Sequence, residues 1–212
     1  MAHLTFTPAD HARIAAAIGQ AEAGTSGEIY AVFSHASDAY GFVAATAALA
    51  LALAAAFLAA LLAPLLGASV QALTLVSCQL AAALLLAGLF AAAPGLRMVF
   101  VPRGIAAARA HAAALKQFAA HGIHVTENRT GVLIFVSAAE RHAEIVADAG
   151  IAERVPQEAW DGIVADLLEA ARADRIADGY VAAVTAAGAL LCEHFPSSGK
   201  NTNELPDRLV VI

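Results

Sequence analysis

Five acidic side chains accompany the short apolar runs of this chain that have the composition of β-strands. Glu28 begins one run, Glu144 and Asp148 belong to another, and Asp38 and Asp161 complete the set. Carboxylates gathered at strand ends bind hard cations through oxygen, and such a cation can polarise a phosphoryl group. The sequence therefore predicts a Ca²⁺ or Mg²⁺ site formed by Asp148, Glu144 and Glu28.

Each of these acids also fits a structural role. Asp148 precedes Gly150, so its side chain can cap the turn between them. Glu28 and Glu144 can equally be solvated charges at the edges of strands. The residue types alone leave the metal site and the structural roles both open.

Other kinds of catalytic site have weaker signals in this sequence. His121 and His124 lack helical i,i+4 placement and an acidic or thiol neighbour, which argues against zinc. Ser137 lacks the Gly-x-Ser-x-Gly turn that exposes a hydrolase nucleophile. The glycines are isolated and form no phosphate-binding loop. Catalytic residues and an organic cofactor are therefore left unassigned.

An α/β fold is predicted from the elements that would carry the acids. Three runs have strand composition: residues 28–34, 130–137 and 142–148. The first two are apolar on both faces, which indicates a sheet with helices on both sides. Helical periodicity or capping signals mark four helices: one from Pro8 to before Gly24, capped by Thr7, one over 104–120, one that starts at Pro156, and one over 180–194 capped by Asp178 and Gly179. The fold class is α/β, a small mixed sheet flanked by helices.

Residues 39–96 contain no Asp, Glu, Lys or Arg and are rich in alanine and leucine. One continuous helix of this length would far exceed the ~30 Å hydrocarbon core of a bilayer, so the segment must break, and Pro64 and Gly67 supply the break. Two spans of transmembrane length remain, 41–62 and 70–92. Two buried helices of a soluble bundle are the alternative, but neither span has a polar face and the leucines favour insertion. We predict a transmembrane hairpin.

The hairpin divides the chain into four parts. Residues 1–40 are the first part of the α/β domain, 41–94 are the hairpin, 95–195 are the rest of the domain, and 196–212 are an irregular tail, of which 209–212 can dock back. Residues 97–102 suit either the membrane interface or a short strand. The basic residues Arg97, Arg103, Arg109 and Lys116 follow the second span, which predicts that both termini are cytoplasmic.

Composition narrows the function classes. The formal net charge of −6 argues against a nucleic-acid binder, which needs a basic surface. The two cysteines, Cys78 and Cys192, give no disulfide framework. A bilayer and an unidentified protein are the expected partners.

Several stretches of the sequence resemble the TPM-domain family, often labelled TPM phosphatase, in a bacterial membrane branch. The stretches that carry the resemblance are 25–29, 129–137, 140–141, 145–151 and 155–160. The resemblance implies an α/β sandwich of helices around a small sheet and location in a bacterial inner membrane. It is also the sole source of a phosphatase-like activity.

Two functions follow from these observations. The favoured hypothesis is a membrane-anchored binding or assembly module for membrane-associated partners. The alternative is a weak metal-dependent phosphatase that uses the carboxylates Glu28, Glu144 and Asp148. The alternative requires these acids to converge in space.

Overall fold

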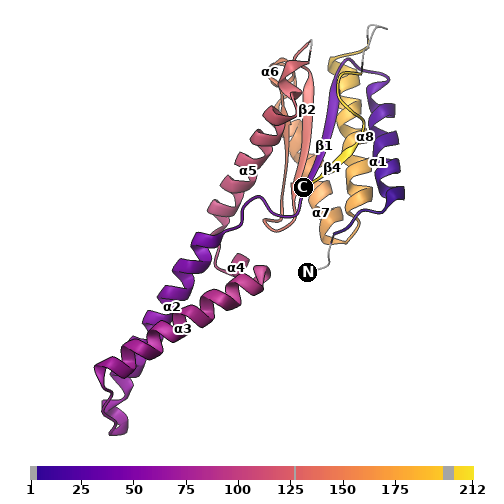
Figure 1. Cartoon of the computed structure of the whole chain (residues 1–212). Helices are drawn as coiled ribbons and strands as arrows, with labels where there is room; N and C mark the ends of the chain where they lie inside the picture. The colour runs from indigo at the N-terminus through magenta and orange to yellow at the C-terminus, as the bar shows by residue number, and fades with distance from the viewer. Residues whose placement is uncertain (1–3, 127, 198–202) are drawn as a thin grey trace. The chain divides into compact units, whose positions relative to one another are not determined.

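The computed structural model describes residues 4–126, 128–197 and 203–212. It divides into two compact units (Figure 1). One unit is made of Met1–Ser37 and Ala107–Ile212, and the other is Asp38–Ala106. The first unit is an α/β domain, and the second is a helical hairpin.

A four-stranded mixed sheet forms the centre of the α/β unit, with the strand order β3-β2-β1-β4. β1 runs parallel to both β2 and β4, whereas β2 and β3 form an antiparallel hairpin. The strands are β1 (Glu28–Ser34), β2 (Gly131–Ser137), β3 (His142–Ala147) and β4 (Leu209–Val211). The prediction that the strands before and after the apolar segment belong to one sheet is confirmed.

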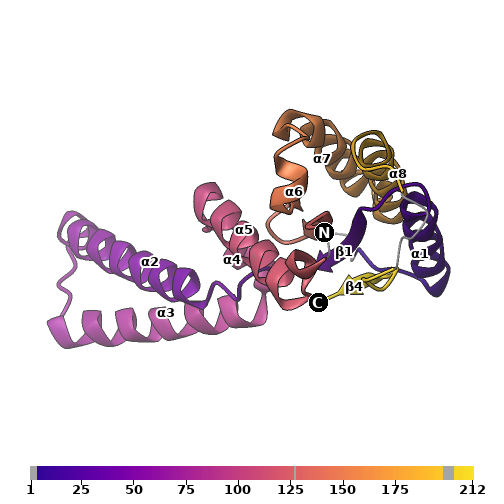
Figure 2. The ribbon, with the colours of Figure 1, turned by 90° about the horizontal axis from the view of Figure 1, so that it is seen from above.

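Helices cover both faces of this sheet (Figure 2). Three of them pack on one face: α1 (Pro8–Glu22), α7 (Gln157–Arg172) and α8 (Ile176–His194). The other face is covered by α5 (Arg103–Ala120), by the 3₁₀ turn η2 (Ile123–Val125) and by part of the C-terminal segment. The short helix α6 (Ala149–Ala152) follows β3. Every residue of β1 and β2 is buried, as their unbroken apolar sequences predicted.

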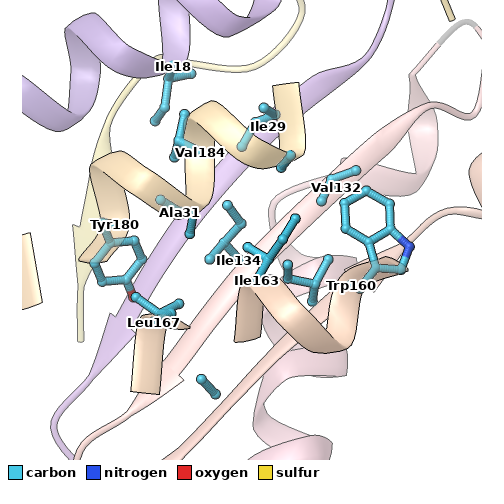
Figure 3. Packing of buried hydrophobic residues seen from close by; sticks show 14 of the residues in the cluster. Ile18, Ile29, Ala31, Val132, Ile134, Trp160, Ile163, Leu167, Tyr180 and Val184 are labelled. Carbon is cyan, nitrogen blue, oxygen red and sulfur yellow. The ribbon is translucent and has the colours of Figure 1, made fainter. Parts of the chain in front are cut away.

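The larger core lies between the sheet and the three helices (Figure 3). Alternate residues of β1 and β2 point into it and meet the apolar faces of α1, α7 and α8: Ile29, Ala31, Val132, Ile134, Ile18, Trp160, Ile163, Leu167, Tyr180 and Val184. The buried Tyr180 hydroxyl donates a hydrogen bond to the Val32 carbonyl at 2.7 Å. Its burial raises the pKa of the Tyr180 phenol well above the usual value.

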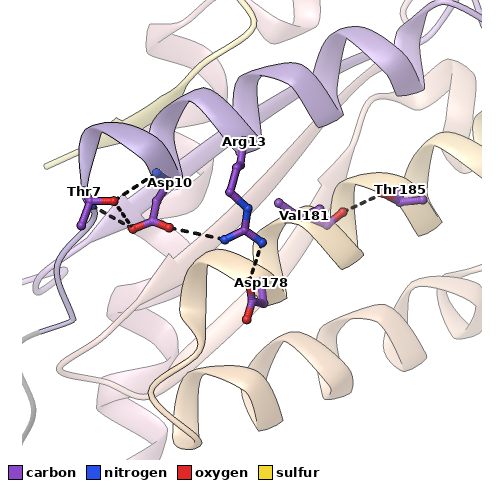
Figure 4. A network of polar contacts seen from close by, with 6 residues as sticks. All are labelled: Thr7, Asp10, Arg13, Asp178, Val181 and Thr185. Atoms are coloured by element: carbon purple, nitrogen blue, oxygen red, sulfur yellow. Dashed lines mark hydrogen bonds and ion pairs between the residues drawn. The ribbon is translucent and has the colours of Figure 1, made fainter.

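The start of α1 confirms the predicted cap (Figure 4). The Thr7 hydroxyl accepts from the Asp10 backbone N–H at 3.2 Å, and the Asp10 carboxylate accepts from the Thr7 backbone N–H at 2.9 Å. Arg13 then reaches from α1 to Asp178 on α8, with Nη2 and Oδ1 2.6 Å apart. These contacts fix the beginning of α1 and tie it to α8.

The hairpin unit contains two long helices, α2 (Gly41–Leu62) and α3 (Ala72–Ala92). They are separated by the 3₁₀ turn η1 (Pro64–Leu66) and by Gly67, whose φ of 69° suits glycine. α2 packs on α3 through Ala44, Ala48 and Phe90, whereas most leucines of both helices point outward and are exposed. Both helices are long and apolar enough to cross a membrane.

The two ends of the hairpin lie close together. Arg97, in the short helix α4 (Pro94–Val99), donates from Nη1 to the Ala39 carbonyl at 2.8 Å. Ala39 precedes α2, and Arg97 follows α3. A side chain at the end of the second helix therefore holds the backbone that enters the first, as expected of a segment that returns to its starting point.

Of the two alternatives for residues 97–102, the short strand is wrong, because residues 94–99 form the helix α4, with Pro94 where a first helical turn needs no N–H donor. The last helix begins at Ile176, not 180: Gly179 is helical rather than a cap, and it lacks the Cβ that would lie 2.8 Å from the Ala170 Cβ of α7. The prediction that residues 209–212 dock back is confirmed, since residues 209–211 form β4 along the open edge of β1. Residues 198–202 of the tail lie outside the described residues.

A third helix, α8, also meets the length and composition expected of a membrane span. It differs from α2 and α3 in its surroundings, because 44% of its most apolar window is buried inside the protein. Its apolar residues contact the sheet, α1 and α7. The hydropathy of α8 is therefore accounted for by the domain core.

Substitution of Gly188 by alanine should destabilise the α/β unit. An added Cβ at Gly188 would lie 2.5 Å from the Ala21 Cβ, where α8 crosses α1. We expect Gly188→Ala to lower the free energy of unfolding by about 1–3 kcal/mol. Urea denaturation followed by the fluorescence of Trp160, the one tryptophan, measures this in the full chain.

Gly162 provides the matched control. It lies in the neighbouring helix α7, and an added Cβ there meets nothing within 4 Å. Gly162→Ala should raise the free energy of unfolding by roughly 0.5–1 kcal/mol, because alanine favours the helix. Equal effects at the two glycines would contradict the close α1–α8 crossing.

Candidate functional site

Glu28, the first residue of β1, holds the C-terminal segment. Its Oε2 accepts hydrogen bonds from the backbone N–H groups of Leu205 at 3.1 Å and Glu204 at 3.3 Å. Its other carboxylate oxygen, Oε1, is buried and has no hydrogen-bond partner. Burial raises the pKa of Glu28 more than these two donors lower it. Glu28 is thus a buried anchor rather than a solvated edge charge.

Asp148 caps the helix that follows β3. Its Oδ1 accepts from the Ala149 backbone N–H at 2.6 Å and lies 3.3 Å from Arg129 Nη2. An added Cβ at Gly150 would lie 2.7 Å from the Arg129 carbonyl oxygen, so the turn fits only glycine there. The structural alternative for Asp148, a capped turn, is therefore confirmed. Its Oδ2 is buried without a hydrogen-bond partner.

Glu144 lies within β3 and faces α5. Its Oε2 is 2.9 Å from His111 Nδ1 of α5 and 3.6 Å from His142 Nε2, two residues earlier on β3. Burial raises the pKa of Glu144, but the hydrogen bonds and charges of His142 and His111 outweigh it and leave that pKa below its usual value. This contact joins α5 to the edge of the sheet.

The three predicted metal ligands occupy separate environments. Glu28 and Asp148 flank Gly131 at one end of the sheet, because Glu28 pairs with Gly131 and the Asp148 N–H donates to the Gly131 carbonyl at 2.9 Å. The Ile123 carbonyl oxygen would lie 2.3 Å from a Cβ added at Gly131, so the backbone of Ile123 covers this glycine closely. Glu144 is four residues from Asp148 along β3, about 13 Å in an extended strand.

The other two acids of the predicted set belong to other elements. The Asp38 Oδ1 accepts from the Tyr40 backbone N–H at 3.1 Å, and Asp161 is exposed on α7. Within the described residues, no three His, Cys, Asp or Glu side chains are grouped as metal ligands. A cation bound by Glu28, Glu144 and Asp148 stays a prediction that this geometry does not support.

A buried carboxyl group that the sequence did not reveal lies next to Glu28. Glu22, in the last turn of α1, accepts from the Ile29 backbone N–H at 2.7 Å. Burial, the charges of Glu28 and Asp207, and a hydrogen bond with Asp207 together raise the pKa of Glu22 to about 8. Glu22 is therefore protonated at neutral pH, and it joins α1, β1 and the C-terminal segment.

A second polar network missed from the sequence lies at the opposite end of β1 and β2. Ser37 Oγ donates to Ser137 Oγ at 2.8 Å, and Ser137 Oγ donates to the Glu140 carboxylate. The Ser37 backbone N–H also donates to Glu140, at 3.0 Å. Ser137 is fully buried, so the network joins the loops after β1 and β2 rather than presenting a nucleophile.

Comparison with known proteins identifies the domain. Residues 94–190 match the family model described as the TPM domain. This part of the chain carries a TPM domain, and the name TPM domain is used here for the α/β unit that contains most of the match. The match includes α5, β2, β3 and α7, whereas α1 and β1 lie before it. The predicted resemblance to the TPM-domain family is therefore confirmed, whereas the bacterial membrane branch stays a prediction.

A solved structure supports the same fold. The NMR structure of BA42 protein from the psychrophilic bacterium Bizionia argentinensis has a TM-score of 0.60 to this chain, at 17% sequence identity. The alignment covers 100% of this chain and 99% of that chain. At this identity the likeness concerns the fold of the TPM domain. A comparison with curated proteins gives no match.

Replacement of Glu144 by glutamine should destabilise the TPM domain in a pH-dependent way. Because its folded-state pKa is lowered, the ionised carboxylate stabilises the fold above its unfolded-state pKa, and this is lost as pH falls through the folded-state pKa. Glu144→Gln should lower the free energy of unfolding by about 1 kcal/mol near neutral pH and by less in acid. Trp160 fluorescence in urea measures it. If wild type and Glu144→Gln differed in free energy of unfolding by the same amount in acid as at neutral pH, the role of the Glu144 charge would be contradicted.

Replacement of Glu22 by glutamine should have the opposite pH dependence. The folded state keeps the Glu22 proton up to about pH 8, whereas the unfolded state loses it near pH 4.5, the ordinary pKa of this side chain. The wild-type free energy of unfolding therefore falls as pH rises through this window, by at most about 1.4 kcal/mol per pH unit. Glu22→Gln still accepts from Ile29 and should remove this slope. The exposed Glu158→Gln is the control, and an unchanged slope in Glu22→Gln would refute the buried proton.

Proposed function

We propose that the protein is an integral protein of a bacterial inner membrane, in which α2 and α3 cross the bilayer and the TPM domain is a cytoplasmic binding or assembly module for membrane-associated partners. The observation that carries this proposal is the hairpin. Residues 39–96 contain no Asp, Glu, Lys or Arg, and the exposed leucines of α2 and α3 are not covered by any other described part of the hairpin unit, which leaves them free to face lipid. Each inserted leucine contributes roughly −0.3 to −0.6 kcal/mol near the bilayer centre.

Charge supports the cytoplasmic location of both termini. Arg97 and Arg103 follow α3, whereas the turn between α2 and α3 carries no charge. Cytoplasmic loops are enriched in Arg and Lys near the ends of membrane helices. The hydrogen bond from Arg97 to the Ala39 carbonyl supports two crossings, since it holds both ends of the hairpin together.

A binding role agrees with the polar groups of the TPM domain. Glu28, Asp148 and Ser137 each connect loops or termini of the fold. These side chains hold backbone in place, and the metal-dependent phosphatase has no observation in its favour among the described residues. The domain therefore offers surfaces to a partner more clearly than it offers a reaction centre.

Cysteine accessibility tests the membrane topology. In a background with Cys78→Ser and Cys192→Ser, Ser69→Cys places a thiol in the turn between α2 and α3, and Thr5→Cys places one before α1. In intact cells, an impermeant maleimide should label Ser69→Cys, whereas Thr5→Cys should react only after permeabilisation. Equal labelling of both, or recovery of the chain outside the membrane fraction, would overturn the proposed topology.

Cross-linking in native membranes tests the binding role. An amine-reactive cross-linker should convert the tagged full chain into a discrete adduct with a partner or with another copy. The tagged chain in a denaturing detergent is the control and should yield monomer. Monomer alone in native membranes would count against an assembly module.

A further inference from the structure

The outward face of α5 is apolar although nothing else in the described part of the α/β unit covers it. α5 packs on the sheet through Ala110 and Ala114, both fully buried. Four residues at heptad spacing lie on the opposite side of the helix and are exposed: Ala108, Ala112, Leu115 and Ala119. Helices that are apolar on opposite faces are normally covered on both. Three alanines in this stripe would let another helix approach closely.

The charge beside this stripe restricts what can cover it. Arg109 and Lys116 lie along one flank, and the sequence of α5 contains no Asp or Glu. Two α5 helices packed against each other would bring these positive charges together. The occupant should therefore be a helix with small central residues and acidic flanks.

The outward face of α7 has this character. Gly162 and Ala165 lie at its centre, and an added Cβ at Gly162 meets nothing within 4 Å. Four acidic residues surround them, all exposed and all without an ion pair or hydrogen bond in the described part of the chain: Glu158, Asp161, Asp166 and Glu169. Such a row of unpaired negative charges in one helix complements the basic flank of α5.

One chain cannot bring these two surfaces together, because α5 and α7 lie on opposite faces of the same sheet (Figure 2). We propose that TPM domains of neighbouring copies associate head to tail, with α5 of one copy on α7 of the next. This inference rests on the proposed function and names a second copy as the partner. A heterologous contact of this kind repeats, and so forms rows or closed rings.

An anionic lipid surface is the competing occupant of α5, since basic residues flank the stripe. With the exposed Ile105, which continues the stripe toward the start of α5, the face presents two large side chains, Ile105 and Leu115, which gives a lipid surface little apolar area to bury. The unpaired acids of α7 also find no partner in that arrangement. We therefore favour the second copy and treat the lipid surface as an outcome of the test.

Disulfide cross-linking between two copies tests the contact directly. Two differently tagged full chains, both with Cys78→Ser and Cys192→Ser, are co-expressed; one carries Ala112→Cys on α5 and the other Ala165→Cys on α7. Copper phenanthroline oxidation of isolated membranes should join the two tags. The matched control replaces Ala165→Cys by Ala186→Cys on the exposed side of α8 and should give no product.

Charge reversal then tests the electrostatic part of the contact. Lys116→Glu on the α5 copy should reduce the cross-linked product about fivefold, because an exposed pair contributes up to ~1 kcal/mol. Glu169→Lys on the α7 copy should restore it, whereas the exposed Glu193→Lys should not. High salt should weaken the wild-type contact through screening.

The outcomes separate this inference from the proposed function. A product of Ala112→Cys with itself, or no product at all, overturns the head-to-tail contact. Protection of Ala112→Cys from a soluble maleimide without any cross-link between copies overturns it too and places α5 on lipid or on another protein, with the membrane module intact. Absence of the chain from the membrane fraction overturns the proposed function instead.

Discussion

Parallel pairing of β1 with β2 is the constraint on which this structure depends. Seven consecutive pairs, from Glu28 with Gly131 to Ser34 with Ser137, join two segments about 100 residues apart. Parallel strands need a long crossover connection, and here that connection contains the whole hairpin and α5. The hairpin is thus an insertion into one sheet rather than an appendage at its end. β4 on one side and β3 on the other then complete the sheet around this pair.

Much of the fold could be predicted because its signals are local. The bounds of α2 follow from the start of the uncharged run and from Pro64, which interrupts that run, and the cap of α1 follows from Thr7 and Pro8. β4 could not be defined, because three apolar residues after a polar tail carry no strand signal of their own. Their position depends on the edge of β1 and on the grip of Glu28 on the backbone of Leu205. A contact between two residues that are 177 positions apart in the sequence leaves no trace in the local periodicity of apolar residues.

In the candidate site, too, the local features could be predicted from the sequence, whereas the contacts between distant residues could not. Glu28 and Asp148 lie at strand ends as predicted, whereas Glu144 lies within β3, and the partners of all three come from loops and helices whose positions a sequence pattern does not give. Arg129 reaches Asp148, and His111 of α5 reaches Glu144 across 33 residues. Glu22 carried no signal, since one acid near the end of a surface helix normally faces water. Whether a carboxylate binds a cation, a backbone N–H or a proton is decided by these neighbours.

The position of β1 ahead of the hairpin has a consequence for synthesis of the chain. At about 5–20 residues per second, several seconds pass between the completion of β1 and of β2 on the ribosome. During this interval the seven residues of β1, all buried in the finished sheet, have no parallel partner. Segments of this kind are prone to misassociation when they are unpaired. Insertion of the proposed transmembrane hairpin into the membrane during translation would add no further delay to this interval. The order of elements alone therefore links the timing of membrane insertion to the formation of the sheet.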